Sequence, residues 1–387
     1  MTANRKPIGE LLEAVPRQPK IKRSEYQDSG RFPIVDQSQA AISGYTNDAS
    51  RLYTGKLPVV VFGDHTRILK FVDYPFCVGA DGTQLLRPVA GNDIRYFYYA
   101  LRNVGLEHYG YERHFKYLKE ESIDVIAPSE QQRIAGILSA YDELIENSQW
   151  RIKILETMVR ALYREWFVHF RFPDSENHPR VASALGEIPQ GWEVKPIKHF
   201  GAVVTGKTPS KANADFYGDD VPFVKTPDMH GSMFLLDVNE RLSIAGAKSQ
   251  ANKTLPIGSI CVSCIGTIGV VSMTTEECQT NQQINSVILK SSASREFLFL
   301  RLQDAKQALE NLGSNGATMG NVNKGKFESM EIVSPAPDLL AKFHYVVKPM
   351  FSEILALSRQ IQNLRRTRDL LLPRLLSGQI TVESTLP

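Results

Sequence analysis

The chain has 387 residues, 42% of them hydrophobic and 22% charged, which is an ordinary composition for a globular protein of two or three domains. Lys and Arg number 45 against 42 Asp and Glu, so the net charge of +3 excludes a generally basic protein, and any nucleic-acid surface must be local. Four irregularly spaced cysteines argue against a disulfide framework. The polar N-terminus without a signal peptide, and apolar runs too short to span a bilayer, predict a cytoplasmic protein.

Residues 1–128 are expected to form a first, β-rich domain. Short runs of β-forming residues alternate there with turn signals such as Gly63-Asp64 and Asp81-Gly82. Near its end, residues 109–117 interleave aromatic and cationic side chains, a pattern that suits a surface for phosphates and bases. A solvated loop with a few packed rings is an equally good interpretation of that stretch.

Residues 129–171 predict a first long helix. From Ile134 to Trp166, residues of mainly apolar character recur in steps that alternate between four and three, which is the heptad pattern of a coiled coil. Ser129 with Gln132 three residues later is typical of a capping-box start. At ~1.5 Å per residue such a helix is roughly 60 Å long, more than a single small domain needs to close its core.

Residues 335–378 repeat this pattern, and each position lies 209 residues after its counterpart, as Phe343 follows Ile134. We therefore predict a tandem duplication, in which a globular segment is followed each time by a long helix. Two unrelated amphipathic helices are the alternative. Pro349 falls inside the second pattern and should kink the helix or make it restart. The residues predicted to form the seam are Ile134, Leu138, Ile145, Ile152, Leu155, Val159, Leu162, Val347, Ile354, Leu357, Ile361, Leu364, Leu371 and Leu375.

A short connector, residues 172–186, leads to a second β-rich domain at residues 187–334, and a tail of residues 379–387 ends the chain. Because the connector is short, the second helix must begin near the end of the first and run back along it. The predicted fold class is α+β, with two β-rich domains at opposite ends of an antiparallel two-helix coiled coil and a pseudo-twofold relation between the halves.

Three motifs resemble sites with known chemistry, but the residues around each one lack what that site requires. Residues 201–208 match the phosphate-binding pattern G-x-x-x-x-G-K-[ST], but a charged, proline-interrupted segment precedes them and no sustained helix follows. Cys261 and Cys264 have the spacing of a zinc pair without a second pair, so buried thiols are the better interpretation. Pro227-Asp228 begins a nuclease-like motif, yet Leu242 stands where lysine is needed. We expect no catalytic residues and no metal site in this chain.

Several segments, in order, resemble the specificity subunit of type I restriction-modification enzymes. Glu130-Gln131 is similar to the start of that family's first conserved helix, and Trp166-Phe167 is similar to its end. Ile188-Pro189-x-Gly191-Trp192, followed by residues 206–210 (Gly-Lys-Thr-Pro-Ser), resembles the beginning of a target-recognition domain. Other similar segments are Pro222-Phe223-Val224, residues 266–269, residues 281–284 and residues 371–378. The first domain departs from this pattern because it lacks Gly-x-Thr-Pro-Ser.

The resemblance implies a DNA-binding subunit that reads a bipartite target in double-stranded DNA and is not catalytic by itself. It implies two methyltransferase subunits and ATP-dependent restriction subunits as partners, with no membrane partner. No cofactor is expected in this chain, whereas S-adenosylmethionine, ATP and Mg are expected in the partner subunits. The alternatives are a coiled-coil scaffold whose ends bind only proteins, and an ATP-using enzyme built on residues 201–208.

Polar residues in loops beside strand ends are the predicted DNA contacts, since Gln and Arg side chains can bond the edges of adenine and guanine at two points. For each of them a surface polar group or turn former is an equally good interpretation. The predicted contacts are Lys207, Ser210, Lys225, Asp228, Thr267, Gln282 and Gln283 in the second domain, and Gln37, His65, Arg67, Arg113, His114 and Lys116 in the first.

Overall fold

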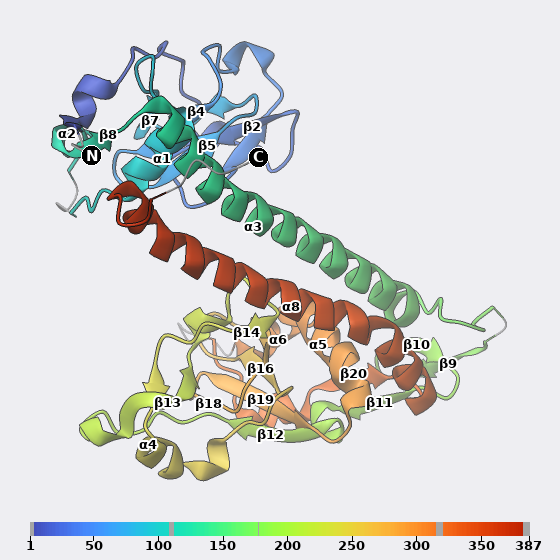
Figure 1. Ribbon diagram of the computed structural model, residues 1–387. Helices are drawn as coiled ribbons and strands as arrows, with labels where there is room; N and C mark the ends of the chain where they lie inside the picture. Colours follow the sequence, from blue (N-terminus) through green and yellow to red (C-terminus); the bar gives the residue numbers. More distant parts are fainter. Residues whose placement is uncertain (1–3, 108–111, 177, 315–319, 382–387) are drawn as a thin grey trace. The chain divides into compact units, whose positions relative to one another are not determined.

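The computed structural model describes residues 4–107, 112–176, 178–314 and 320–381. It divides into two units, and each is described by itself: one holds the chain up to Asn147 together with residues from Gln360 onward, and the other holds Ser148–Arg359. Each unit contains one β-rich domain and part of both long helices, α3 (Pro128–Tyr163) and α8 (Pro337–Leu376) (Figure 1). Among the described residues, no helix combines the length and the apolar character needed to cross a membrane.

Among its described residues, the first β-rich domain has three small sheets and two short α-helices. Strand β4 has all five residues buried, as expected for the apolar run Val-Val-Val-Phe-Gly, and it lies between β5 and β7. Helix α1 begins where the side chain of Asp93 accepts a hydrogen bond from Tyr96 N at 2.8 Å. The elements are β1 (Asn4–Pro7), β2 (Phe32–Val35), β3 (Gly44–Thr46), β4 (Val59–Gly63), β5 (Leu69–Val72), β6 (Cys77–Val78), β7 (Thr83–Leu86), α1 (Ile94–Arg102), α2 (Phe115–Glu120) and β8 (Ser122–Val125).

The second β-rich domain is larger and is built around a five-stranded sheet in the order β12-β19-β16-β17-β14. A hairpin of β9 and β10 precedes it in the chain. Its elements are β9 (Arg180–Ser183), β10 (Gly186–Pro189), β11 (Glu193–Pro196), β12 (Gly201–Thr205), β13 (Tyr217–Val224), β14 (Phe234–Leu235), β15 (Arg241–Leu242), α4 (Ile244–Lys248), β16 (Ile260–Ser263), β17 (Val271–Thr274), β18 (Gln279–Thr280), β19 (Ile284–Leu289), α5 (Arg295–Asp304), α6 (Lys306–Gly313), α7 (Lys324–Ser329) and β20 (Glu331–Ser334).

The two domains share one strand topology, which extends the duplication from the helices to the sheets. Strand β2 is antiparallel to β3 and parallel to β6, and β13 has the same relations to β15 and β18. Strand β4 lies between β5 and β7, as β16 lies between β17 and β19, with antiparallel pairing throughout. The terminal pairs β1–β8 and β11–β20 are also equivalent. The fold is thus α+β with a repeated β-rich domain.

Individual backbone hydrogen bonds repeat as well. Val35 O accepts from Gly79 N at 3.0 Å in the first domain, and Val224 O accepts from Asn281 N at 3.0 Å in the second. Asp64 N donates to Gly82 O at 2.7 Å, and Cys264 N donates to the carbonyl of Gln283 at the same distance. Bonds that recur in this way align the two domains residue by residue where their sequences do not.

The long helices run antiparallel within each unit. In the first unit, Ile134 and Leu138 of α3 share a core cluster with Leu375 of α8, while Arg368 of α8 pairs with Asp142. In the second unit, Arg151 of α3 pairs with Glu353, and farther along the Trp166 ring lies 5.6 Å from that of Phe343. Residue numbers therefore rise along one helix as they fall along the other.

The residues predicted for the seam are all withdrawn from solvent. Nine are buried, and Ile152, Leu155, Leu162, Leu364 and Leu371 are partly buried. Two details differ from expectation. Both helices begin at a proline, Pro128 and Pro337, so the first does not begin at a capping Ser129, because proline fits the first helical position, where its missing N–H is not needed. Helix α8 also continues through Pro349 without restarting.

A buried ionic cluster joins α5 to α8 in the second unit. Glu296 is fully buried, and one of its oxygens accepts from the Arg295 guanidinium at 2.7 and 3.0 Å. The other oxygen lies 2.5 Å from His344 Nδ1 on α8. Removing both partners would leave a buried carboxylate without compensation, and the bond to His344 ties the domain to α8.

We predict that Val347→Asp destabilises the second unit by about 3 to 5 kcal/mol, because it places an unpaired charge in a fully buried position. Tyr345→Asp, two residues earlier on α8, is the control, since that side chain is 83% exposed and its change should fall within about 0.5 kcal/mol. Denaturant unfolding of both variants measures the difference. Equal stability of the two would mean that Val347 does not face the core.

Candidate nucleic-acid interface

The Gly-Lys-Thr-Pro-Ser segment of the second domain forms a loop at the end of β12. Gly206 N donates to Ile284 O at 3.1 Å and Lys207 N donates to Thr280 O at 2.9 Å, so the loop lies against the turn between β18 and β19. A Cβ at Gly206 would stand 2.2 Å from Asn281 O, which explains the glycine. The strand ends thus bring together two loops that are 75 residues apart in sequence, 206–210 and 281–283.

These two loops present polar side chains to solvent. Lys207, Ser210 and Gln282 are exposed, and the Thr208 hydroxyl donates to Gln282 Oε1 at 2.6 Å. Thr267, in the turn between β16 and β17, is also exposed. The amide of Gln283 is partly buried and accepts from Asn281 Nδ2 at 3.0 Å. A cation, hydroxyls and a glutamine amide are suited to phosphates and base edges.

Two residues predicted as contacts in the second domain are instead committed to a turn. Lys225 Nζ pairs with Glu240, and its backbone N donates to Asp228 Oδ2 at 2.8 Å. Asp228 Oδ1 also accepts from Asn239 Nδ2 at 2.7 Å. The Asp228 carboxylate therefore holds the chain after β13, and its role as a base contact stays a prediction.

In the first domain, Gln37 and His65 lie together at the ends of β2 and β4. The Gln37 amide oxygen accepts from His65 N at 3.2 Å, and the Thr66 hydroxyl donates to Gln37 O at 2.6 Å. The Gln37 side chain packs against Gly82, and a Cβ added to that glycine would lie 2.3 Å from Gln37 Oε1. Of the predicted contacts, His65, Arg113 and Lys116 are exposed, whereas Gln37 and Arg67 are partly buried.

His114 cannot serve as a DNA contact, contrary to the sequence prediction. Its side chain is fully buried, and Nδ1 lies 3.0 Å from the carbonyl oxygen of Asp64. The Asp64 carboxylate accepts from Phe115 N at 2.8 Å and so supports the start of α2. Arg67 is also engaged, because its guanidinium donates to Leu106 O at 2.8 Å. Of the aromatic and cationic stretch at residues 109–117, residues 109–111 lie outside the described part of the chain.

The second domain matches a known family. Residues 189–338 match the type I restriction modification DNA specificity domain. The specificity subunit of the type I restriction enzyme HindI from Haemophilus influenzae is 34% identical over 316 residues, which cover 67% of this chain and 69% of that protein. The chain belongs to the type I restriction enzyme specificity subunits.

Other relatives agree with this family. The MjaIX specificity subunit of Methanocaldococcus jannaschii is 28% identical over 272 residues, covering 69% of this chain and 62% of that protein. The crystal structure of a type I restriction-modification S subunit from M. genitalium aligns over 97% of this chain and 96% of that chain, with a TM-score of 0.61 at 15% identity. This specificity subunit therefore shares its fold with that structure.

Residues 201–208, which match the phosphate-binding pattern, comprise strand β12 and the start of the 206–210 loop. Residues Gly201–Thr205 are strand β12, which pairs antiparallel with β19, and Lys207 follows in the loop rather than at a helix start. The next helical element is a single turn at Ala214–Phe216. Backbone N–H groups are thus not arranged around a phosphate as a nucleotide-binding loop requires.

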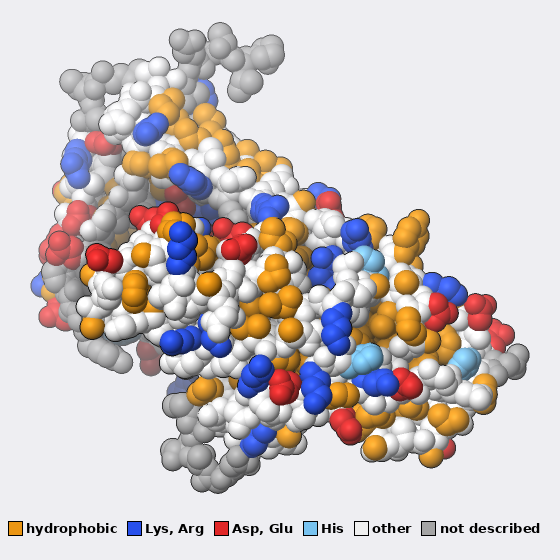
Figure 2. Space-filling model, turned by 90° about the horizontal axis from the view of Figure 1, so that it is seen from below, with side chains coloured by type: hydrophobic (Ala, Val, Ile, Leu, Met, Phe, Trp, Pro, Cys, Tyr) orange, Lys and Arg blue, Asp and Glu red, His pale blue; other side chains and the backbone are white. Residues whose placement is uncertain are grey.

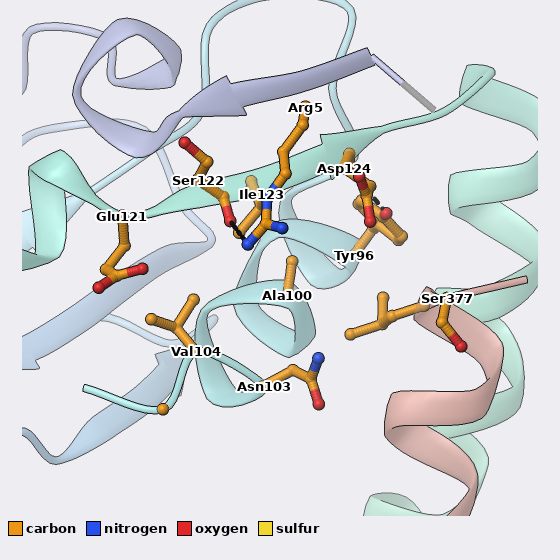
Figure 3. A pocket seen from close by; sticks show the side chains of 12 residues that line it. Arg5, Tyr96, Ala100, Asn103, Val104, Glu121, Ser122, Ile123, Asp124 and Ser377 are labelled. Atoms are coloured by element: carbon orange, nitrogen blue, oxygen red, sulfur yellow. Dashed lines mark hydrogen bonds between the residues drawn. The ribbon is translucent and has the colours of Figure 1, made fainter. Parts of the chain in front are cut away.

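A pocket in the first unit shows no catalytic arrangement. It measures about 260 Å³ and is lined by residues of β1, α1, β8 and the end of α8 (Figure 3). Arg5 donates to Ser122 O at 3.4 Å, and the Tyr96 hydroxyl donates to Asp124 O at 2.9 Å. These bonds tie strands and helix together. The lining residues supply no pair of nucleophile and base, so the pocket does not suggest an active site.

The face drawn in Figure 2 carries separate Lys and Arg side chains between acidic and hydrophobic ones. This agrees with the small net charge of +3.

All four cysteines are buried free thiols. Burial raises the pKa of Cys261 to about 12 and that of Cys264 to about 11, and it also raises the pKa values of Cys77 and Cys278. Within the described part of the chain, no group of three or more His, Cys, Asp or Glu side chains is placed to hold a metal ion. Cys261 and Cys264 are therefore core residues.

We predict that the native protein resists alkylation by iodoacetamide at pH 8, because a thiol with a raised pKa stays protonated and the protonated form is not the nucleophile. Unfolding in guanidinium chloride should expose all four thiols to rapid reaction. Mass spectrometry counts the modified cysteines in both states. Fast labelling of Cys261 or Cys264 in the native protein would contradict their burial.

Proposed function

We propose that this specificity subunit reads a bipartite target in double-stranded DNA, with one β-rich domain on each part of the target. In the proposed complex, methyltransferase and restriction subunits carry out the chemistry, and the specificity subunit itself is not the catalyst. The observation that carries the proposal is the duplicated domain. The same strand pairings and backbone hydrogen bonds are present in both domains, and the loops that they position carry different side chains in the two copies.

The chemistry of those loops supports reading by each domain. Gln282 in the second domain and Gln37 in the first can each offer an amide to an adenine edge. Lys207 in the second domain and Arg113 in the first are exposed cations, suited to phosphates or guanine. Because the loops differ between the domains, the two parts of the target are expected to differ in sequence.

The long helices are proposed to dock the methyltransferase subunits. On α3, the side chains of Trp150, Ile154 and Met158 are 55%, 56% and 49% exposed. Their spacing of four residues places them along one face of the helix, outside the seam. A partner helix packed along this face would bury them, which supports an assembly role beyond pairing with α8.

Cofactors are proposed to reside in the partners. S-adenosylmethionine is expected in the methyltransferase subunits, and ATP and Mg in the restriction subunits. The coiled-coil scaffold alternative is not supported, since the family match lies on the second β-rich domain and reaches α8 only at its first residues. A cytoplasmic location follows from the proposed access to DNA.

We predict that exchanging residues 187–334 for the same domain of another specificity subunit changes one part of the methylated target and leaves the other part unchanged. Each domain has its own sheets and core, so the graft should not disturb the loops of the first domain. Sequencing of methylated adenines in DNA modified by the complex reports the target. The unchanged chain assembled with the same partners is the control, and a change in both parts would refute independent reading.

A further inference from the structure

The repeat assigns a counterpart to the Gly-Lys-Thr-Pro-Ser loop in the first domain, where sequence comparison finds none. Lys207 N donates to Thr280 O of β18 at 2.9 Å. Ile21 N donates to Val78 O of β6 at the same 2.9 Å. Strand β6 is the parallel partner of β2, as β18 is of β13. Ile21 is therefore the structural equivalent of Lys207.

A second pair of bonds fixes the same alignment at the other end of the segment. Leu11 O accepts from Val89 N at 2.8 Å, and Phe200 O accepts from Lys290 N at 3.0 Å. The chain between Leu11 and Ile21 therefore passes along β7 as β12 passes along β19. It forms isolated bridges, at Leu12 and at Ile21, rather than a regular strand, so no strand pattern marks it in the sequence.

This segment is strongly basic. Residues 17–23 read Arg-Gln-Pro-Lys-Ile-Lys-Arg, with four cations and no acidic residue. Ile21 is 3% exposed and anchors the segment, while Arg17, Lys22 and Arg23 are exposed. The charge that Lys207 carries in the second domain is thus carried here by the neighbours of Ile21.

The segment adjoins the loops already described for the first domain. Arg17, Gln18 and Lys20 line a groove of about 470 Å³ with Asp81 and Gln84. Lys20 Nζ donates to Asp81 O at 2.7 Å. Burial lowers the pKa of Lys20, and the nearby charge of Arg113 lowers it further, against the effect of Asp81 and Asp64. The charges of Asp81, Asp64 and Arg113 therefore act on Lys20.

We propose that residues 17–23 contact the DNA backbone for the first domain, with Lys22 and Arg23 on phosphates, as the counterpart of the 206–210 loop. This inference rests on the proposed function, because it assumes that the first domain binds DNA. Phosphate contacts of this kind set register and contribute affinity without reading bases. The bases would be read beside them, from Gln37 and His65.

The test compares Lys22→Ala/Arg23→Ala with Arg31→Ala/Lys56→Ala in the complex with methyltransferase subunits. Arg31 and Lys56 are exposed cations of the same domain, but they precede β2 and β4, whose opposite ends carry Gln37 and His65. The affinity for a duplex containing the target is measured over a range of salt concentrations. Thermal unfolding of both variants, and a Lys22→Arg variant that keeps the charge, control for folding.

We expect the Lys22/Arg23 variant to reduce the slope of log affinity against log salt by about two, because each lost phosphate contact releases about one counterion fewer. Its methylated sequence should stay the same. The Arg31/Lys56 variant and Lys22→Arg should keep the wild-type slope. An unchanged slope for Lys22/Arg23, or an equal loss in the control pair, overturns this inference. Failure of the wild-type complex to prefer its target would instead overturn the proposed function.

Discussion

The arrangement of both β-rich domains depends on the hydrogen bonds between two parallel strands and the segment that crosses them. In the first domain Gly79 N bonds to Val35 O and Ile21 N bonds to Val78 O; Asn281 with Val224 and Lys207 with Thr280 make the equivalent bonds in the second. A parallel pair needs a crossover connection, so segments far apart in sequence are brought to one edge of the sheet. The loops that carry Gln37, His65, Lys207, Thr267 and Gln282 each begin within a few residues of the end of a strand.

In both domains, the groups that position the loops differ from the side chains that can recognise DNA. Backbone groups hold the loops in place, so the side chains on them can differ between the copies without altering the fold. Asp228 and Asp64 show the limit of that freedom, since both carboxylates are used to fix chain direction, at the turn after β13 and at the start of α2. The helices have a separate role. Their buried residues join each domain to α3 and α8, and the hydrogen bond between Glu296 and His344 adds a polar link in the second unit.

Sequence patterns predicted the parts of this molecule that are periodic. The 209-residue repeat is visible because heptads place apolar residues at regular intervals, as in Ile134 and Phe343. The apolar run of β4 was also recognisable as a β-forming segment, whereas the loop at Gly206 was recognised only through its resemblance to a family. His114 could not be judged in this way, because its burial depends on the carbonyl of Asp64, fifty residues away. Residues 17–23 were not singled out for a related reason: the segment from Leu11 to Ile21 pairs through isolated bridges at Leu12 and Ile21, which leave no periodic trace in a sequence.

The central claim is that two separate readers act on one DNA molecule. The most direct measurement is to methylate a pool of random duplexes with the wild-type complex and to sequence the modified molecules. The account predicts two short defined blocks of different sequence, separated by a gap of constant length and no defined sequence. A single continuous block, or enrichment without any defined sequence, would contradict it.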